Sequence, residues 1–178
     1  MRAFLTLLAC LGSLAAATLE RISLDDMIGK STAIVRGRVS GSSAQFHGSM
    51  IYTHLKIQVL ERWKGSPAAV QEIIVPGGKV ANARQSFSGT PALAEGTEYV
   101  LFLWTGRNGL THIIGLSQGV FDLKQSASGA KMATKSATSE LMLEPGSGQV
   151  VKDEALEITL EDLGRRIVAV LGGKGGAK

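Results

Sequence analysis

Residues 97–104 read Thr97-Glu98-Tyr99-Val100-Leu101-Phe102-Leu103-Trp104, an almost unbroken apolar run. Side chains of a β-strand point alternately to the two faces of its sheet, so a run that is apolar throughout has two faces to bury. This pattern is typical of a central strand that is covered on both sides. We therefore expect residues 97–104 to lie inside the main sheet, with a hydrophobic layer on each face.

Two earlier segments show the period-two alternation of strands with one buried face. Residues 33–39 place Val35 and Val39 on one face, and Arg36 and Arg38 on the other. Residues 51–59 form the longest alternating segment. Its inward set is Ile51, Thr53, Leu55, Ile57 and Val59, and its outward set is Tyr52, His54, Lys56 and Gln58. A strand of this length spans roughly 30 Å, which suits a strand that bends around the corner of a barrel.

The rest of the pattern predicts short strands, two helices and two long loops. Strands are expected at residues 70–75, 111–114, 119–123 and 141–143, and helices at residues 23–30 and 159–171. Ser23 and Thr159 are the expected N-caps, since their hydroxyls accept from free amides of the first turn. The segments 40–50 and 77–91 are rich in Gly and Ser and are expected to be exposed loops. Residues 124–138 are expected to form a hairpin or a mobile loop.

The N-terminus has the order of a secretory signal peptide. Arg2 precedes an apolar run over residues 3–14, and Ala15-Ala16-Ala17 supplies small residues for cleavage. We therefore expect a signal peptide at residues 1–17, one domain over residues 18–171 and a disordered Gly/Lys tail over residues 172–178. Residues 7–10 also resemble a bacterial lipoprotein box, but the apolar run before Cys10 is short for one, so cleavage after Ala17 is preferred. The mature chain would be periplasmic or extracellular and would contain no cysteine and no transmembrane segment.

Composition and charge argue against several classes of protein. The formal net charge is only +4 and aromatic residues make up 5% of the chain. Arg36, Arg38 and Lys56 form a basic strip on the outer face of the predicted sheet, but nucleic-acid binding needs stacking aromatics as well. We expect this strip to be a solvated face and expect no nucleic-acid partner. Loss of Cys10 with the signal would also exclude a thiol enzyme and a Cys-ligated zinc site.

Neither the serine motif nor the histidines predict an active site. Residues 115–119 match G-x-S-x-G, whose nucleophile needs a strand, a sharp turn and a helix, with a histidine later in the chain. Here residues 120–123 continue as a strand, and His47, His54 and His112 all precede Ser117. The histidines lack metal-ligand spacing. We therefore expect no catalytic residues, no cofactor and no metal, although a hydrolase remains the least favoured alternative.

Residues 32–123 resemble the netrin-like module found in tissue inhibitors of metalloproteinases. The segments that carry the resemblance are Thr32–Val39, Ile51–Val59 followed by Trp63-Lys64-Gly65, and Gly96–Phe102. The fold that this resemblance implies is an OB-like Greek-key β-barrel, here within a mainly β (α+β) chain that has a short N-terminal helix and a C-terminal helix. End to end, the chain resembles uncharacterised secreted bacterial proteins. The inhibitors chelate protease zinc through an N-terminal cysteine, whereas the predicted mature N-terminus here is Thr18.

These observations favour an exported, non-enzymatic domain that binds a protein or an envelope component through its loops. Phe46 in the first predicted loop and Phe87 in the second are the expected apolar anchors, with Arg84 beside Phe87. Folding of both rings back into the core is the alternative for these two residues. For the whole chain, the alternative is an inhibitor or accessory module of an exported protease.

Overall fold

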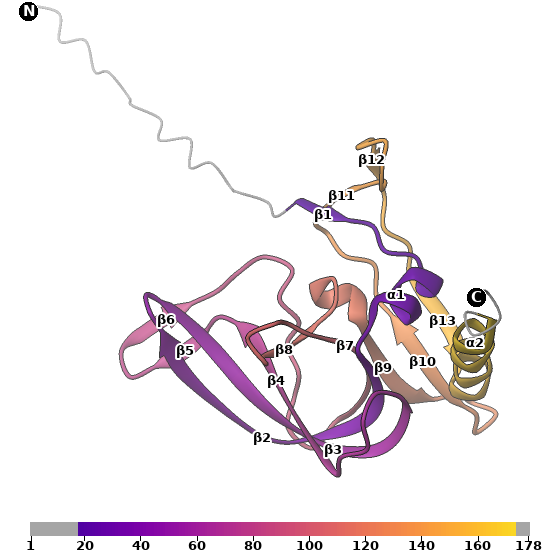
Figure 1. The fold of residues 1–178 in the computed structure, drawn as a ribbon, viewed down its shortest axis with the longest axis horizontal. Helices are drawn as coiled ribbons and strands as arrows, with labels where there is room; N and C mark the ends of the chain where they lie inside the picture. Colours follow the sequence, from indigo (N-terminus) through magenta and orange to yellow (C-terminus); the bar gives the residue numbers. More distant parts are fainter. Residues whose placement is uncertain (1–17, 174–178) are drawn as a thin grey trace, which may run out of the picture.

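The computed structural model describes residues 18–173 as a mainly β protein with an α-helix near each end (Figure 1). The predicted signal peptide, Cys10 and most of the predicted tail lie outside the described residues. The strands are β1 (Thr18–Glu20), β2 (Ala33–His47), β3 (Met50–Lys64), β4 (Val70–Pro76), β5 (Gly78–Val80), β6 (Ala83–Gln85), β7 (Glu98–Thr105), β8 (Thr111–Ile113), β9 (Val120–Gln125), β10 (Lys131–Lys135), β11 (Leu141–Leu143), β12 (Val150–Val151) and β13 (Leu156–Thr159). The helices are α1 (Leu24–Lys30), the 3₁₀ helix η1 (Leu116–Gly119) and α2 (Leu160–Gly173).

The main sheet has the strand order β13-β10-β9-β7-β2-β3-β4-β8. A further pairing joins β8 to β7, so β7, β2, β3, β4 and β8 form a closed ring of neighbours. Most of these pairs are antiparallel, whereas β4 and β8 run parallel. The sheet is ring-like rather than a barrel, because β9, β10 and β13 continue outward from β7.

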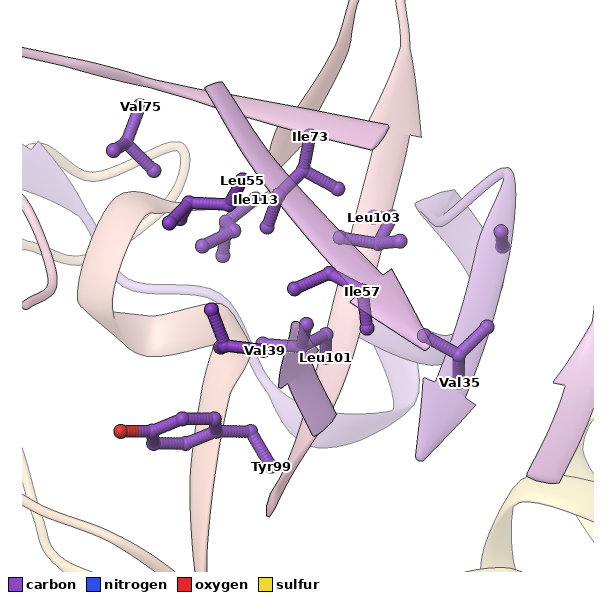
Figure 2. Packing of buried hydrophobic residues seen from close by; sticks show 11 residues of the cluster. Val35, Val39, Leu55, Ile57, Ile73, Val75, Tyr99, Leu101, Leu103 and Ile113 are labelled. Atoms are coloured by element: carbon purple, nitrogen blue, oxygen red, sulfur yellow. The ribbon is translucent and has the colours of Figure 1, made fainter. Parts of the chain in front are cut away.

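Strand β7 lies between two hydrophobic clusters, as its unbroken apolar run predicts. Tyr99, Leu101 and Leu103 point into the ring, where they pack with residues of β2, β3 and β4 (Figure 2). Val100 and Phe102 point to the opposite face, where they pack against α1, α2 and β9. The side chains of residues 99–103 therefore alternate between the two hydrophobic clusters, and β7 belongs to both.

Both predicted helix caps are present. The Ser23 hydroxyl accepts a hydrogen bond from the amide of Asp26, and the Thr159 hydroxyl accepts one from the amide of Asp162. The apolar stripe of α2, which includes Leu163 and Ile167, faces the second cluster. This helix continues to Gly173, two residues beyond the predicted end. No helix within residues 18–173 combines the length and apolar character needed to cross a membrane.

The prediction of a loop over residues 40–50 is wrong. Strand β2 continues to His47 and pairs with β3 down to the rung His47–Met50, which leaves only Gly48 and Ser49 as the turn. Gly and Ser lower strand propensity, but the backbone of this segment completes the hydrogen-bond ladder of a strongly β-forming partner. Register shifts near Val39 and Gly41 accommodate the bend of the hairpin.

Of the two remaining loop predictions, the one over residues 77–91 changes, whereas the hairpin expected over residues 124–138 is confirmed. The segment 77–91 contains the small hairpin β5–β6, and residues 124–138 include the end of β9 and all of β10, which are joined by a short turn. In both cases, short strands whose composition is typical of loops are held by backbone pairing.

A buried ion pair links the end of β10 to the segment between β12 and β13. The Asp153 side chain is only 6% exposed and accepts two hydrogen bonds from Lys135 Nζ, at 2.9 and 3.0 Å. It accepts a third from the amide of Thr138 at 2.9 Å. The acidic pair Asp153-Glu154 is expected from sequence to lie in a loop or at a helix start. It does lie in a loop, and the structure adds that the Asp153 side chain is buried there.

We expect Asp153→Ala to lower the free energy of unfolding by about 3–5 kcal/mol, because it leaves the Lys135 ammonium buried without its counter-charge. The neighbouring Glu154 is exposed, so Glu154→Ala is the matched control and should change stability by less than about 0.5 kcal/mol. Urea unfolding followed by circular dichroism measures both. Equal midpoints for the two variants would contradict this role for Asp153.

Candidate functional site

The long hairpin β2–β3 carries one of the predicted anchors near its tip. Phe46 lies opposite Ile51 in the ladder, so both side chains share the inner face of the hairpin. Ile51 is fully buried, whereas Phe46 is 48% exposed. The exposed ring therefore lies where the buried face of the hairpin meets solvent.

The hairpin β5–β6 packs beside this tip (Figure 1). The Gln85 side chain holds it there, because its Oε1 accepts from the Ile51 amide at 2.6 Å and its Nε2 donates to the Ser49 carbonyl at 2.8 Å. The Gly77 amide also donates to the Ile51 carbonyl. These bonds tie two segments that are distant in sequence into one rigid unit.

Two consecutive glycines allow this close approach. Gly77 and Gly78 have φ angles of +93° and +138°, which favour glycine. A Cβ on Gly78 would lie 2.5 Å from Thr53 Oγ1 and 3.1 Å from the Ala44 Cβ. Side chains at these positions would push β5 away from β2 and β3.

Arg84 and Phe87 line one shallow cavity of about 300 Å³ between the β5–β6 hairpin and the ring. Leu55 and Val75 supply apolar lining from the ring, and Leu93 supplies it from the segment before β7. Phe87 is 38% exposed. The structure therefore brings Arg84 and Phe87 together, while Phe46 lies on the adjoining strand β2 and does not line the cavity. Neither phenylalanine is folded into the core.

Lys79 adds a second cation to this end of the molecule. It lies opposite Arg84 in the β5–β6 ladder, so the two side chains share a face. Neither residue forms an ion pair with any residue between 18 and 173. Sequence analysis missed Lys79, because only the register of β5 and β6 places it beside Arg84. The tip surface, defined as Phe46, Lys79, Arg84 and Phe87, is thus apolar and cationic.

The predicted basic strip is largely neutralised by carboxylates. Arg38 donates to Glu98 at 2.6 Å, and Arg36 lies 3.4 Å from Glu61. The Arg38 hydrogen bond, with added attraction from Lys131, holds the pKa of Glu98 below its ordinary value. This face therefore has less free positive charge than its arginines alone indicate.

The serine motif does not form the elbow of a hydrolase. Gly115 and Leu116 adopt left-handed conformations, Ser117 lies in the short helix η1, and β9 follows at Val120. The Ser117 hydroxyl is buried, and within residues 18–173 it has no hydrogen-bond partner. His112 contacts Trp104 on β7, and burial lowers the pKa of its imidazole. The expected strand after Ser117 is thus confirmed.

No protein-family model matches the chain, and no curated protein matches it.

We expect Gln85→Ala to destabilise the chain by about 1–3 kcal/mol, because it leaves the partly buried Ile51 amide without its acceptor. Hydrogen exchange followed by NMR should show faster exchange of the Ile51 amide. Gln71→Ala is the control, since within residues 18–173 the side-chain Nε2 of Gln71 donates only to the carbonyl of the next residue, Glu72. Unchanged protection of Ile51 would show that Gln85 does not hold the two hairpins together.

Proposed function

We propose that this protein is an exported, non-enzymatic binding domain whose tip surface contacts another protein or an envelope component. The observation that carries the proposal is that two exposed phenylalanines, and two cations without an ion pair within residues 18–173, lie on or next to two hairpins held together by Gln85. Single exposed apolar residues are common, but aromatic side chains and arginine together are enriched at the centres of protein interfaces.

The chemistry of the surface indicates the kind of partner. Phe46 and Phe87 offer apolar area, and Lys79 and Arg84 offer donors for carboxylates. A partner segment that presents an aliphatic or aromatic side chain next to Asp or Glu would complement both. Because the two hairpins are already ordered, little conformational entropy would be lost on binding.

The compartment assigned in this proposal is the periplasm or the exterior of the cell, reached through the signal peptide at residues 1–17. An envelope fraction is therefore the appropriate source of partners.

We expect the Phe46→Ala, Phe87→Ala double variant to lose at least about 2 kcal/mol of binding free energy for its partner. The assay is a pull-down from an envelope fraction, with captured proteins identified by mass spectrometry and their affinity then measured with purified partner. Added salt should weaken binding by the native chain, because Lys79 and Arg84 are exposed charges.

Trp104→Ala is the matched control, since Trp104 is an equally exposed aromatic residue on β7. Binding that is unchanged in the double variant, or reduced as much by Trp104→Ala, would contradict the proposed surface.

A second candidate function is inhibition of an exported protease, and the strand order favours it. We propose that the ring β7-β2-β3-β4-β8 is a variant of the OB-type Greek key expected from the netrin-like resemblance. Support comes from the three consecutive antiparallel strands, the return of β7 beside β2, and the parallel contact of β4 with β8. Thr18, however, starts a strand that pairs with β11, and it carries no thiol to chelate zinc.

If inhibition is the function, the purified chain should slow at least one exported protease in a panel of metalloproteases and serine proteases. The readout is steady-state cleavage of peptide substrates at micromolar protein. No inhibition across the panel would count against this candidate and leave the binding proposal intact.

A further inference from the structure

The outer face of the β2–β3 hairpin carries two histidines that the sequence separates by a turn. His47 on β2 and His54 on β3 stack with ring centroids 5.6 Å apart and an interplanar angle of 19°. The Gln45 side chain lies between their nitrogens, with its Nε2 2.7 Å from His54 Nε2 and 3.3 Å from His47 Nε2. Two imidazole nitrogens therefore converge on one point, which a side-chain amide occupies.

The surroundings of His54 fix which of its nitrogens carries the proton. Its Nδ1 lies 2.7 Å from Glu72 Oε1 on β4, and a carboxylate only accepts hydrogen bonds. The proton of the neutral ring is therefore on Nδ1, and Nε2 presents a lone pair. Donation from the Gln45 amide to Nε2 agrees with this tautomer.

This hydrogen-bond arrangement is common among histidines that bind metal ions. A ligating imidazole usually donates its other N–H to a carboxylate, which orients the ring and raises the basicity of the free nitrogen. The His54 side chain is only 12% exposed, so the ring is held in place. His47 is exposed, and its ring is free to adjust toward a shared ligand.

We propose that His47 and His54 bind a late first-row divalent ion through their Nε2 atoms, with Gln45 displaced from between them. Imidazole ligands suit Cu²⁺, Ni²⁺ and Zn²⁺, and among these ions Cu²⁺ binds most tightly to a given site. Zn²⁺–nitrogen bonds are about 2.0–2.1 Å long. Both histidine Nε2 atoms must therefore move closer to the point that the Gln45 side-chain nitrogen occupies.

The neighbourhood leaves room for the ion and its water ligands. A cavity of about 410 Å³ beside His54 is lined by Gln45, Lys56 and Glu72, together with the small residues 40–43. The Gln45 side chain can move into this space. Lys56 places one positive charge near the site, and Glu72 offsets it with one negative charge.

The site is a two-histidine site with open positions, since residues 18–173 contain no group of three or more His, Cys, Asp or Glu side chains placed to hold a metal. The expectation of no metal rested on the absence of a short-range histidine motif. Only the hairpin register, with His54 opposite Ser43 and His47 opposite Met50, leaves the two rings on one face of the same hairpin. The proposal does not depend on the binding function of the tip surface.

The test is isothermal titration of the untagged full chain with Cu²⁺ and, separately, with Zn²⁺. We expect one ion per chain, with Cu²⁺ bound more tightly than Zn²⁺. His47→Ala should weaken binding at least about tenfold, and Glu72→Gln should weaken it by about 10–100-fold through loss of the partner of Nδ1. Because His47 is exposed, its replacement should leave the fold intact, which circular dichroism checks.

His112→Ala is the matched control, because His112 is a histidine on β8, outside the β2–β3 hairpin, and should leave the affinity unchanged. Absence of binding to the wild-type chain would overturn the proposal. So would full affinity in His47→Ala, or an equal loss in His112→Ala.

Discussion

The two-sided burial of β7 is the constraint on which the rest of the structure depends. Its interior side chains alternate between the ring and the helical layer, so neither face tolerates water or charge. The ring must close over Leu101 and Leu103, and the two helices with β9 must cover Val100 and Phe102. The ring strands bury one face of β7, and α1, α2 and β9 bury the other.

This constraint explains why the surfaces proposed for binding lie at the far end of the hairpin. Near β7, strands β2 and β3 are part of the core, and their side chains are committed to packing. Beyond Arg38, β2 no longer pairs with β7, and the far end of the β2–β3 hairpin is contacted by the small hairpin β5–β6 (Figure 1). Exposed side chains there are free to serve binding because the fold does not need them inside.

Local pattern was enough to predict the mainly β class, the central place of residues 97–104, both helix caps and the apolar stripe of α2. It failed where long-range partners decide the conformation. The Gly/Ser-rich segment 40–47 is a strand because β3 supplies its ladder, and no local signal reports that pairing. The same holds for Gln85, which acts through Ile51 and Ser49, and for Lys79 beside Arg84. It also holds for Asp153, a loop residue whose partner Lys135 lies on β10. Phe46, Phe87 and Arg84 are candidates because they fall in segments expected to be loops; Phe46 in fact lies on β2, and both phenylalanine rings are exposed.

The period of two that defines a strand also separates the two proposed chemistries of the hairpin. Phe46 and Ile51 point to the inner face, whereas Gln45, His47 and His54 point to the outer face. The rung that carries Phe46 therefore lies between the rungs of Gln45 and His47. An ion held by His47 and His54 would cross-link the two strands near the tip and restrict their relative motion. This restriction would also hold Phe46 more rigidly on the inner face. Because the two sites share no side chain, any coupling between them must pass through the backbone of residues 45–47.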